Sequence, residues 1–336
     1  MTGPPPATAA VRVAVRRCLA DLPHDAAVAA AVSGGADSLA LAAALTFERP
    51  GSSALVVDHG LQPGSREVAE RAAQQCRGLG LDAAVLDAAS TSGLPQRPHA
   101  GEAPKTTTLG GGGPEAAARA LRYRLLDDAV VGRALAVVLL GHTLDDQAET
   151  VLLGLARGSG ARALAGMPAV RGPYRRPLLG LDRATVRTAC AEAGLPPHDD
   201  PHNDDDAFAR ARVRRDLLPL LERSLGPGVA AALARTADQL RDDADALDAL
   251  TSDLPAEPSC DDVAALPAAL RSRALKRWAE QQCGVAVTAA HVEALRALVD
   301  TWRGQGAVAL PGGAQVRRED GRLVPGGARR DDVRGG

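Results

Sequence analysis

Short apolar runs alternate with longer segments of helical periodicity in the first part of the chain. The apolar runs, each short enough for one buried strand, are residues 26–32, 54–57, 82–86 and 135–140. The segments with apolar residues at helical spacing are residues 7–22, 39–47, 65–79 and 115–131. Strands that alternate with helices in this way predict an α/β fold with a mostly parallel, doubly wound sheet covered on both faces.

The pattern changes in the second part of the chain. Helical periodicity there covers residues 208–222, 229–250, 266–282 and 288–302. Short strand patterns, joined by Gly-Gly and Asp-Gly turns, follow at residues 307–310, 314–318 and 322–324. Because 336 residues exceed one ordinary domain, we expect two. The expected parts are an α/β domain at 1–222, a smaller, mainly helical domain at 223–326 and a disordered tail at 327–336.

Composition refines this picture of the core and the surface. Hydrophobic residues make up 46% of the chain and aromatic residues only 2%, so Ala, Val and Leu must build the core. Trp278 and Trp302 lie in helical patterns, and we assign both to that core. Residues 89–113 are rich in Gly, Pro and Thr, which is typical of a flexible surface insertion.

Other properties of the sequence exclude several classes of protein. No apolar run is long enough to span a membrane, and the N-terminus does not resemble a secretory signal. The five cysteines show neither metal-binding nor disulfide spacing, so we expect a cytoplasmic protein with incidental thiols. A formal net charge of −2 argues against a uniformly basic nucleic-acid binder but is compatible with a local basic patch.

A glycine-rich turn joins the first predicted strand to the next helix, where residues 33–38 read Ser-Gly-Gly-Ala-Asp-Ser. Gly34 and Gly35 allow close approach of the backbone to a ligand, and the N–H groups and dipole of the following helix favour an anion. The Walker lysine is missing, and Asp37 suits a phosphate site where a divalent cation lies between them. The alternative is an ordinary turn with a capping Ser or Asp.

A second polar cluster, residues 141–150, starts at the end of another predicted strand and enters a helix. Asp146 and Glu149 are three residues apart and share one helix face. Beside a phosphate loop such a pair favours Mg²⁺ or a substrate ammonium group, although the helix dipole alone also favours carboxylates there. His142 is either a capping side chain or a polar contact to nucleotide. Ligands bind at the carboxyl ends of parallel strands, and residues 141–150 follow such an end. We therefore interpret this cluster as part of a functional site.

Together these segments resemble the N-type ATP pyrophosphatases, in which an SGGxDS turn binds the pyrophosphate of ATP. Within that superfamily the sequence is most similar to the shorter members of the tRNA(Ile)-lysidine synthetase family. The matching segments, in the order of the family, are Ser33–Ser38, Val57–Leu61, Glu115–Arg119, Arg122–Tyr123, His142–Thr150, Arg157–Gly160, Arg176–Leu179, Asp200–Asn203, Arg210–Arg214 and Leu217–Pro219.

The resemblance implies a reaction on the wobble cytidine of an isoleucine tRNA with a CAU anticodon, and a catalytic domain of the adenine nucleotide alpha hydrolase-like type. ATP, with Mg²⁺, activates the C2 oxygen of the base as an adenylate, and free L-lysine then displaces AMP through its ε-amine. AMP is needed because an amide-like oxygen is a poor leaving group. The enzyme must also neutralise phosphate charge and align the amine. A homodimer is compatible with the sequence, which does not fix the oligomeric state.

The resemblance also implies roles for individual residues. The expected ATP-binding residues are Ser33, Gly34, Gly35, Ala36, Asp37, Ser38, His59, Gly60 and His142, with Asp37 on Mg²⁺. The expected residues near the phosphates or the cytidine adenylate are Asp37, Arg119 and Arg122. The expected lysine-binding residues are Asp146, Glu149, Asn203 and Arg214, with Gly158, Ser159 and Gly160 in a loop near the site. Candidate tRNA phosphate contacts are Arg271, Arg273, Arg277, Arg317 and Arg318.

Several of these assignments have alternatives. Arg119, Arg122 and the candidate tRNA contacts could each be a solvent-exposed helix charge. Asn203 could be an ordinary turn residue, and Gly158 and Gly160 could simply end the preceding helix. The sequence departs from the family at Thr143, where a second histidine is frequent, at Ala211, where Asn is frequent, and in the long insertion. The alternative functions are another tRNA-modifying or amidating enzyme of the superfamily, or a non-catalytic nucleotide- or tRNA-binding protein. The clustered cysteines of the 2-thiocytidine enzymes are absent from this sequence.

Overall fold

The computed structural model describes residues 3–58, 60, 64–87, 114–158, 160–198 and 208–326, with residues 114–116 described by their backbone alone. Three predicted site residues, His59, Ser159 and Asn203, lie outside the described residues, as do the predicted insertion at 89–113 and the predicted tail at 327–336. The chain divides into two compact units, Met1–Leu240 and Arg241–Gly336. The predicted boundary at 222/223 lies inside the first unit.

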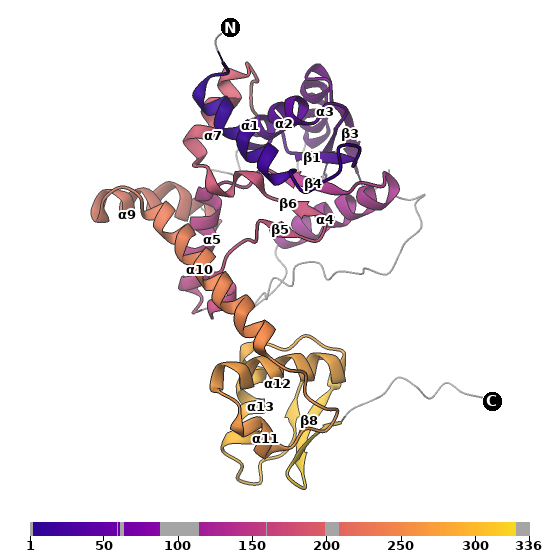
Figure 1. The fold of residues 1–336 in the computed structure, drawn as a ribbon, viewed down its shortest axis with the longest axis vertical. Helices are drawn as coiled ribbons and strands as arrows, with labels where there is room; N and C mark the ends of the chain where they lie inside the picture. Colours follow the sequence, from indigo (N-terminus) through magenta and orange to yellow (C-terminus); the bar gives the residue numbers. More distant parts are fainter. Residues whose placement is uncertain are drawn as a thin grey trace, which may run out of the picture. The chain divides into compact units, whose positions relative to one another are not determined.

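A six-stranded, mostly parallel sheet forms the centre of the first unit (Figure 1). Its strands, in spatial order, are β3 (Asp82–Leu86), β2 (Ser53–Val57), β1 (Val28–Val32), β4 (Val137–Leu140), β6 (Tyr174–Arg175) and β5 (Val170–Arg171). The pairs among the first five are parallel, and β5 pairs antiparallel with β6. The predicted α/β sheet is thus confirmed.

Helices cover both faces of this sheet. The helices of the first unit are α1 (Pro6–Cys18), α2 (Ala36–Glu48), α3 (Ser65–Gly78), α4 (Pro114–Gly132), α5 (Leu144–Ala156), α6 (Ala161–Leu164), α7 (Arg183–Glu192), α8 (Ala209–Arg212) and α9 (Leu218–Leu225). Figure 1 shows α1, α2, α3 and α7 on one side of the sheet and α4 on the other. A π-helical turn at Val213–Leu217 joins α8 to α9, where the sequence predicted one helix at 208–222.

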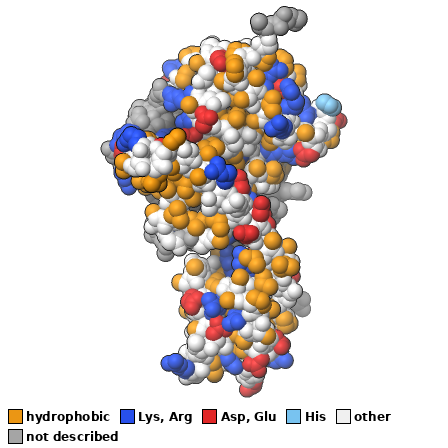
Figure 2. Space-filling view, turned by 60° about the vertical axis from the view of Figure 1, so that its left-hand side comes forward, with side chains coloured by type: hydrophobic (Ala, Val, Ile, Leu, Met, Phe, Trp, Pro, Cys, Tyr) orange, Lys and Arg blue, Asp and Glu red, His pale blue; other side chains and the backbone are white. Residues whose placement is uncertain are grey.

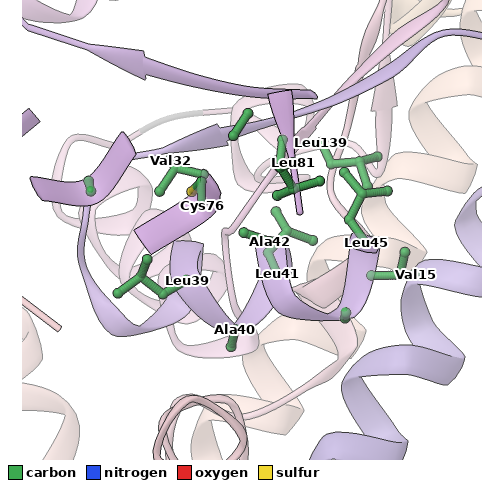
Figure 3. Close-up of a cluster of buried hydrophobic side chains, with 14 of the residues drawn as sticks. Val15, Val32, Leu39, Ala40, Leu41, Ala42, Leu45, Cys76, Leu81 and Leu139 are labelled. Carbon is green, nitrogen blue, oxygen red and sulfur yellow. The ribbon is translucent and has the colours of Figure 1, made fainter. Parts of the chain in front are cut away.

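The core of the first unit lies in two layers because the side chains of β1 alternate between the two faces. Val28, Ala30 and Val32 pack with α1, α2, α3 and α7, whereas Ala29 and Ala31 pack with α4. Figure 3 shows the first layer, in which Leu39, Leu41 and Leu45 of α2 lie near Cys76 of α3 and Leu139 of β4. Apolar residues on both faces are typical of a parallel sheet covered by helices. The predicted Ala, Val and Leu core is confirmed here.

The strand order places a topological switch between β1 and β4. From β1 the chain moves outward to β2 and β3, and it then returns to the other side of β1 to form β4. Ala31 of β1 pairs with Leu140 of β4, so both strands end at the same edge. A crevice opens at such a point because the following loops diverge. The two polar segments singled out in the sequence are those loops.

The second unit has a small helical and antiparallel architecture. Helix α10 (Val229–Leu250) spans the division between the units, and the elements after it are α11 (Cys260–Ala265), α12 (Ala268–Cys283), α13 (Ala289–Asp300), β7 (Val308–Ala309), β8 (Gln315–Glu319) and β9 (Arg322–Gly326). The three strands form an antiparallel sheet in the order β7-β8-β9. In the described part of the chain, no helix is long and apolar enough to cross a membrane.

The two tryptophans of the second unit differ in burial. Trp278 is fully buried in the core of the unit, and its indole N–H donates to the carbonyl of Ala256 over 3.0 Å. Trp302 is 38% exposed, so its assignment to the core was wrong. The physical reason is that α13 ends at Asp300, two residues before the end of the predicted helix. Trp302 therefore does not follow the helical spacing that would have turned it inward.

Candidate active site

A cavity of about 540 Å³ lies where β1 and β4 end. Its lining residues are Ala31, Ser33, Gly35, Ala36, Asp37, Ser38, Arg122, Gly141, His142, Asp146, Arg183, Arg187, His198 and Arg214. The structure thus brings together the glycine turn, the second polar cluster and the arginine helix, which are far apart in the sequence. Among its lining residues are members of the predicted ATP-binding, adenylate and lysine-binding sets. The lining also contains five residues for which the sequence predicted no role, and three of them carry polar side chains: Arg183, Arg187 and His198.

The glycine turn is held in shape by its two serines. Ser38 Oγ accepts a hydrogen bond from the Ser33 amide over 3.1 Å and donates one to the Gly35 carbonyl over 2.9 Å. Gly34 has φ +86°, and a Cβ there would lie 3.3 Å from the Cβ of Ala72. Helix α2 begins directly after Gly35, which leaves the first N–H groups of the helix without intrahelical partners. Such a terminus beside a cavity can bind an anion.

Asp37 stands at this turn with one carboxylate oxygen unsatisfied. Its Oδ1 is buried and has no hydrogen-bond partner among the described residues, while Oδ2 lies 3.7 Å from Nε of Arg183. Burial raises the pKa of Asp37 to about 6, against the lowering effect of Arg183. No group of three or more His, Cys, Asp or Glu in the described chain could hold a metal ion by itself. A single carboxylate with an unsatisfied oxygen nevertheless fits Mg²⁺, which binds through one or two carboxylates together with substrate phosphates.

The second polar cluster begins with a capped helix. Thr143 is the N-cap of α5, and the Asp146 carboxylate accepts hydrogen bonds from its amide and hydroxyl through Oδ2, over 2.8 and 3.0 Å. Thr143 is fully buried. The capping box holds Asp146 in one orientation, with Oδ2 occupied by the cap. Thr143, which stands where the family frequently has a second histidine, therefore serves as a helix cap in this chain.

Three arginines surround Asp146 and the fully buried Glu149. Asp146 Oδ1 lies 2.8 Å from Nη2 of Arg183 and 3.1 Å from Nη2 of Arg214. Glu149 Oε1 lies 2.7 Å from Nε of Arg214 and 3.2 Å from Nη1 of Arg183, and Oε2 lies 2.9 Å from Nε of Arg210. A buried carboxylate is costly unless it is paired and hydrogen-bonded in this way. Burial alone would raise the pKa of Asp146, but Arg183 and the Thr143 amide outweigh it, and the pKa is lowered.

Two further predicted residues line the cavity, one from the segment after β4 and one from α4. Burial lowers the pKa of His142 to about 3, so its imidazole is neutral, and Nδ1 is buried without a hydrogen-bond partner in the described structure. The guanidinium of Arg122, on α4, is buried, and this burial lowers its pKa. A neutral imidazole beside an arginine suits a polar contact to a nucleotide or a base.

The other described residues of the predicted site do not line the cavity. The guanidinium carbon of Arg119 lies 5.2 Å from the centre of the Tyr123 ring, one helical turn along α4. Gly60 is exposed, with φ +61°, and its amide donates to Asp58 over 3.0 Å. Gly158 has φ +64° after the end of α5, and Gly160 is the N-cap of α6. Their proposed roles beside substrate remain predictions.

Sequence reasoning missed Arg183 because nothing nearby distinguishes it from a surface arginine. It is the first residue of α7, after the N-cap Asp182, whose side chain accepts from the Thr185 amide over 2.7 Å. Arg210 was part of a quoted motif but received no role. His198 contributes its backbone: its amide donates to the Gly34 carbonyl over 2.9 Å. These contacts depend on which elements pack together, which local patterns do not reveal.

The arginines predicted to contact tRNA all have partners within the chain. Arg271 pairs with Asp300, Arg273 with Asp248, Arg277 with Asp253 and Arg317 with Glu319, while Arg318 donates to the carbonyl of Leu298. The Arg318 guanidinium also lies 5.7 Å from the centre of the Trp302 ring. On the face shown in Figure 2, basic and acidic side chains are intermixed over the second unit. The role of these arginines in binding tRNA remains a prediction.

Comparison with protein families identifies both parts of the chain. The model of the PP-loop domain matches residues 8–221, and the model of the TilS substrate binding domain matches residues 259–324. A likeness to the solved U34-tRNA thiolase NcsA from Methanococcus maripaludis, with TM-score 0.56 and 20% identity over 70% of this chain and 79% of that one, supports the fold alone.

Curated relatives match over nearly their whole length. The tRNA(Ile)-lysidine synthase of Thermobifida fusca is 49% identical over 337 residues, which cover 96% of this chain and 99% of that protein. The tRNA(Ile)-lysidine synthase of Nocardia farcinica is 51% identical, with 94% and 96% of the two chains covered. The corresponding protein of Streptomyces coelicolor is 47% identical, with 96% and 99% covered. The chain therefore belongs to the tRNA(Ile)-lysidine synthase family.

Proposed function

We propose that this protein joins lysine to C2 of the wobble cytidine of tRNA(Ile) with a CAU anticodon, using ATP and passing through an adenylated tRNA. The observation that carries the proposal is a single cavity with two kinds of lining. One wall is the phosphate-type turn with Asp37, and the other contains Asp146 with Arg183 and Arg214. The fully buried Glu149 does not line the cavity itself but pairs with the same two arginines. Two chemically different substrates can meet in such a cavity. Membership of the family supports the same reaction.

The first half-reaction transfers the adenylyl group of ATP to the cytidine. The C2 oxygen attacks the α-phosphorus, a P–O bond forms, and the bond to the leaving diphosphate breaks. The amides at the start of α2 would hold the phosphates, and Arg122 would neutralise charge on them. Mg²⁺ would be held by Asp37 and would supply further neutralisation of phosphate charge. His142, which is neutral, would contribute a polar contact at the base or nucleotide.

The second half-reaction replaces AMP by lysine. The ε-nitrogen forms a bond to C2, the C2–O bond breaks, and AMP leaves with the bonding electrons, while the amine loses a proton. Asp146 and Glu149 would bind the ammonium group of lysine, and Arg214 would pair with its carboxylate. Holding the amine in line with C2 is the main contribution that positioned side chains can make to this step. The proposal also includes Asn203 among the residues that bind lysine. It further includes a cytoplasmic location for the protein.

Two assays test the proposal with purified protein. ATP–diphosphate exchange in the presence of unmodified tRNA(Ile) transcript, without lysine, should report the first half-reaction. Mass spectrometry of the tRNA nucleosides after incubation with ATP and lysine should then detect lysidine. Exchange without lysidine would indicate another enzyme of the superfamily that adenylates tRNA. Absence of both would indicate a binding protein without this catalytic activity and would exclude the proposal.

Variants of Asp37 and Glu149 should affect different half-reactions. We expect Asp37→Ala to abolish ATP–diphosphate exchange, because this variant removes the carboxylate at the phosphate turn. We expect Glu149→Gln to retain exchange and to raise the KM for lysine, because only the amine side of the cavity changes. Normal use of lysine by Glu149→Gln would show that the lysine site is placed wrongly. A matched control is Glu48→Gln, which removes a carboxylate paired with Arg12 and Arg16 outside the cavity.

A further inference from the structure

Arg183 contacts acidic groups on both sides of the cavity. Its Nε lies 3.7 Å from Oδ2 of Asp37 at the glycine turn. Its Nη2 lies 2.8 Å from Oδ1 of Asp146, and both terminal nitrogens lie 3.2 Å from Oε1 of Glu149. One side chain thus bridges the phosphate-type turn and the carboxylate pair. Arg210 and Arg214 also bind the pair, but Arg183 is the one of these three with an ion pair to Asp37.

The backbone of Arg183 is anchored independently of these ion pairs. Its amide donates to Oδ2 of Asp145 over 2.7 Å, and the amide of Leu144 donates to the carbonyl of Leu181 over 2.9 Å. The start of α7 is therefore fastened to the start of α5. The guanidinium can change its partners by rotation of its own side chain, without movement of either helix. The distance between the two sides of the cavity is short enough for a single arginine to reach both.

The carboxylate pair has no free oxygen in this arrangement. Asp146 Oδ2 accepts from Thr143, and Oδ1 accepts from Arg183 and Arg214. Glu149 Oε1 accepts from Arg183 and Arg214, and Oε2 accepts from Arg210 and Arg214. An incoming ammonium group can therefore bind the pair only if it replaces a guanidinium. Arginines also outnumber carboxylates in the lining, so the cavity attracts a phosphate more strongly than a cation.

We propose that Arg183 is a positioning residue that couples the nucleotide side of the cavity to the lysine side. Without nucleotide, its guanidinium occupies the place of the lysine ammonium group between Asp146 and Glu149. Phosphates at the turn draw the guanidinium to themselves, because they offer more negative charge than Asp37 alone. The positions that it leaves at Oδ1 of Asp146 and Oε1 of Glu149 are then open to the ammonium group, while Arg210 and Arg214 keep their own contacts with the pair. This inference rests on the proposed function, which places phosphates at the turn and lysine at the pair.

Such a bridge makes the binding of nucleotide and lysine cooperative. Equilibrium dialysis with labelled lysine tests this on the full-length protein, with and without Mg²⁺ and α,β-methylene-ATP, which cannot release diphosphate. We expect the analogue to lower the Kd for lysine at least about fivefold in the wild type, in the usual range of such couplings. In Arg183→Gln no guanidinium occupies the place of the lysine ammonium group between Asp146 and Glu149. Lysine should therefore bind this variant with the same Kd with and without the analogue. Cooperativity retained in this variant, or absent from the wild type, would overturn the proposal.

A matched control removes a different arginine of similar burial. The Arg12 side chain is 16% exposed and lies 3.0 Å from Glu48 outside the cavity, and that of Arg183 is 15% exposed. Arg12→Gln should retain the cooperativity of the wild type. A measurement that needs no variant uses inorganic pyrophosphate in place of the analogue. Pyrophosphate should also tighten the binding of lysine to the wild type, and a lack of effect would overturn the proposal even if Arg183→Gln does not fold.

Glu149→Gln distinguishes failure of this inference from failure of the proposed function. If that variant binds lysine as the wild type does in both conditions, the lysine site itself is wrong. If it weakens lysine binding while Arg183→Gln keeps full cooperativity, the lysine site stands and the coupling role of Arg183 is wrong.

Discussion

Gly141, at the end of β4, lies directly against the backbone of Asp37. A Cβ at Gly141 would be 3.2 Å from the carbonyl carbon and oxygen of Asp37, closer than most real Cβ contacts. This contact sets how closely the second polar cluster approaches the glycine turn. The relationship explains why a residue without a side chain stands between a buried strand and His142.

The first prediction concerns Gly141→Ala. The added methyl group must push the turn away from β4, so we expect ATP–diphosphate exchange to fall about tenfold to hundredfold, as misplacement of reacting groups typically does. Kinetics of exchange with tRNA transcript provide the measurement. Gly78→Ala is the control, because a Cβ there meets nothing within 4 Å. Unchanged exchange in Gly141→Ala would show that the close approach of the two segments does not matter for adenylation.

A second prediction concerns the cap of α5. Thr143→Ala removes the hydroxyl that caps the helix and donates to Asp146, which should cost about 1 kcal/mol of stability. The KM for lysine should rise as Asp146 loses a donor, whereas ATP–diphosphate exchange should change little. Thr288→Ala is a matched control, because Thr288 caps α13 through a similar capping box in the second unit. It should cost similar stability and leave the KM for lysine unchanged, and equal effects of the two variants on KM would contradict the prediction.

The sequence was sufficient to predict both polar loops and the strands β1 to β4, and the reasons are local. It did not predict the two-residue strands β5 and β6. Buried strands such as 28–32 are continuous apolar runs, and the glycine turn carries a restrictive pattern of its own. The meeting of these loops in one cavity follows from the rule that parallel strands end at one edge. Arg183 could not be found in this way, because its contacts depend on the packing of α7 beside α5 and α2.

The error at Trp302 has a different cause. Helical spacing was extended to residue 302, but Thr301 has φ −138°, so the chain leaves the helix before the tryptophan. Helix ends are set by backbone geometry and packing over one or two residues, which periodicity does not resolve. A shift of two residues was enough to move a large aromatic side chain from the core to the surface.

The third prediction is a dependence of stability on pH that arises from His142. In the unfolded chain its pKa takes the ordinary value of about 6.5, whereas burial lowers it to about 3 in the folded protein. Between these values the unfolded state binds more protons, so His142 opposes folding increasingly as the pH falls below the unfolded pKa. The penalty grows by about 1.4 kcal/mol per pH unit and is absent above neutral pH. Urea unfolding provides the measurement. The free energy of unfolding should decrease less between pH 8 and pH 5 for His142→Asn than for the wild type. An equal decrease in both proteins would refute a neutral, buried imidazole.

The last prediction uses the contrast between the two tryptophans. Trp278 is fully buried, whereas Trp302 is 38% exposed and has the Arg318 guanidinium over its ring. A small quencher should therefore reach only Trp302. Acrylamide quenching of the intrinsic fluorescence measures this, because these two residues are the tryptophans of the chain. We expect Trp302→Phe to remove the quenchable part of the emission and to leave the blue-shifted emission of Trp278. The variant should unfold at nearly the same urea concentration as the wild type, because the exposed ring contributes little to the core. Emission from Trp302→Phe that is quenched as strongly as that of the wild type would show that Trp278 is accessible to the quencher and would contradict the contrast between the two tryptophans.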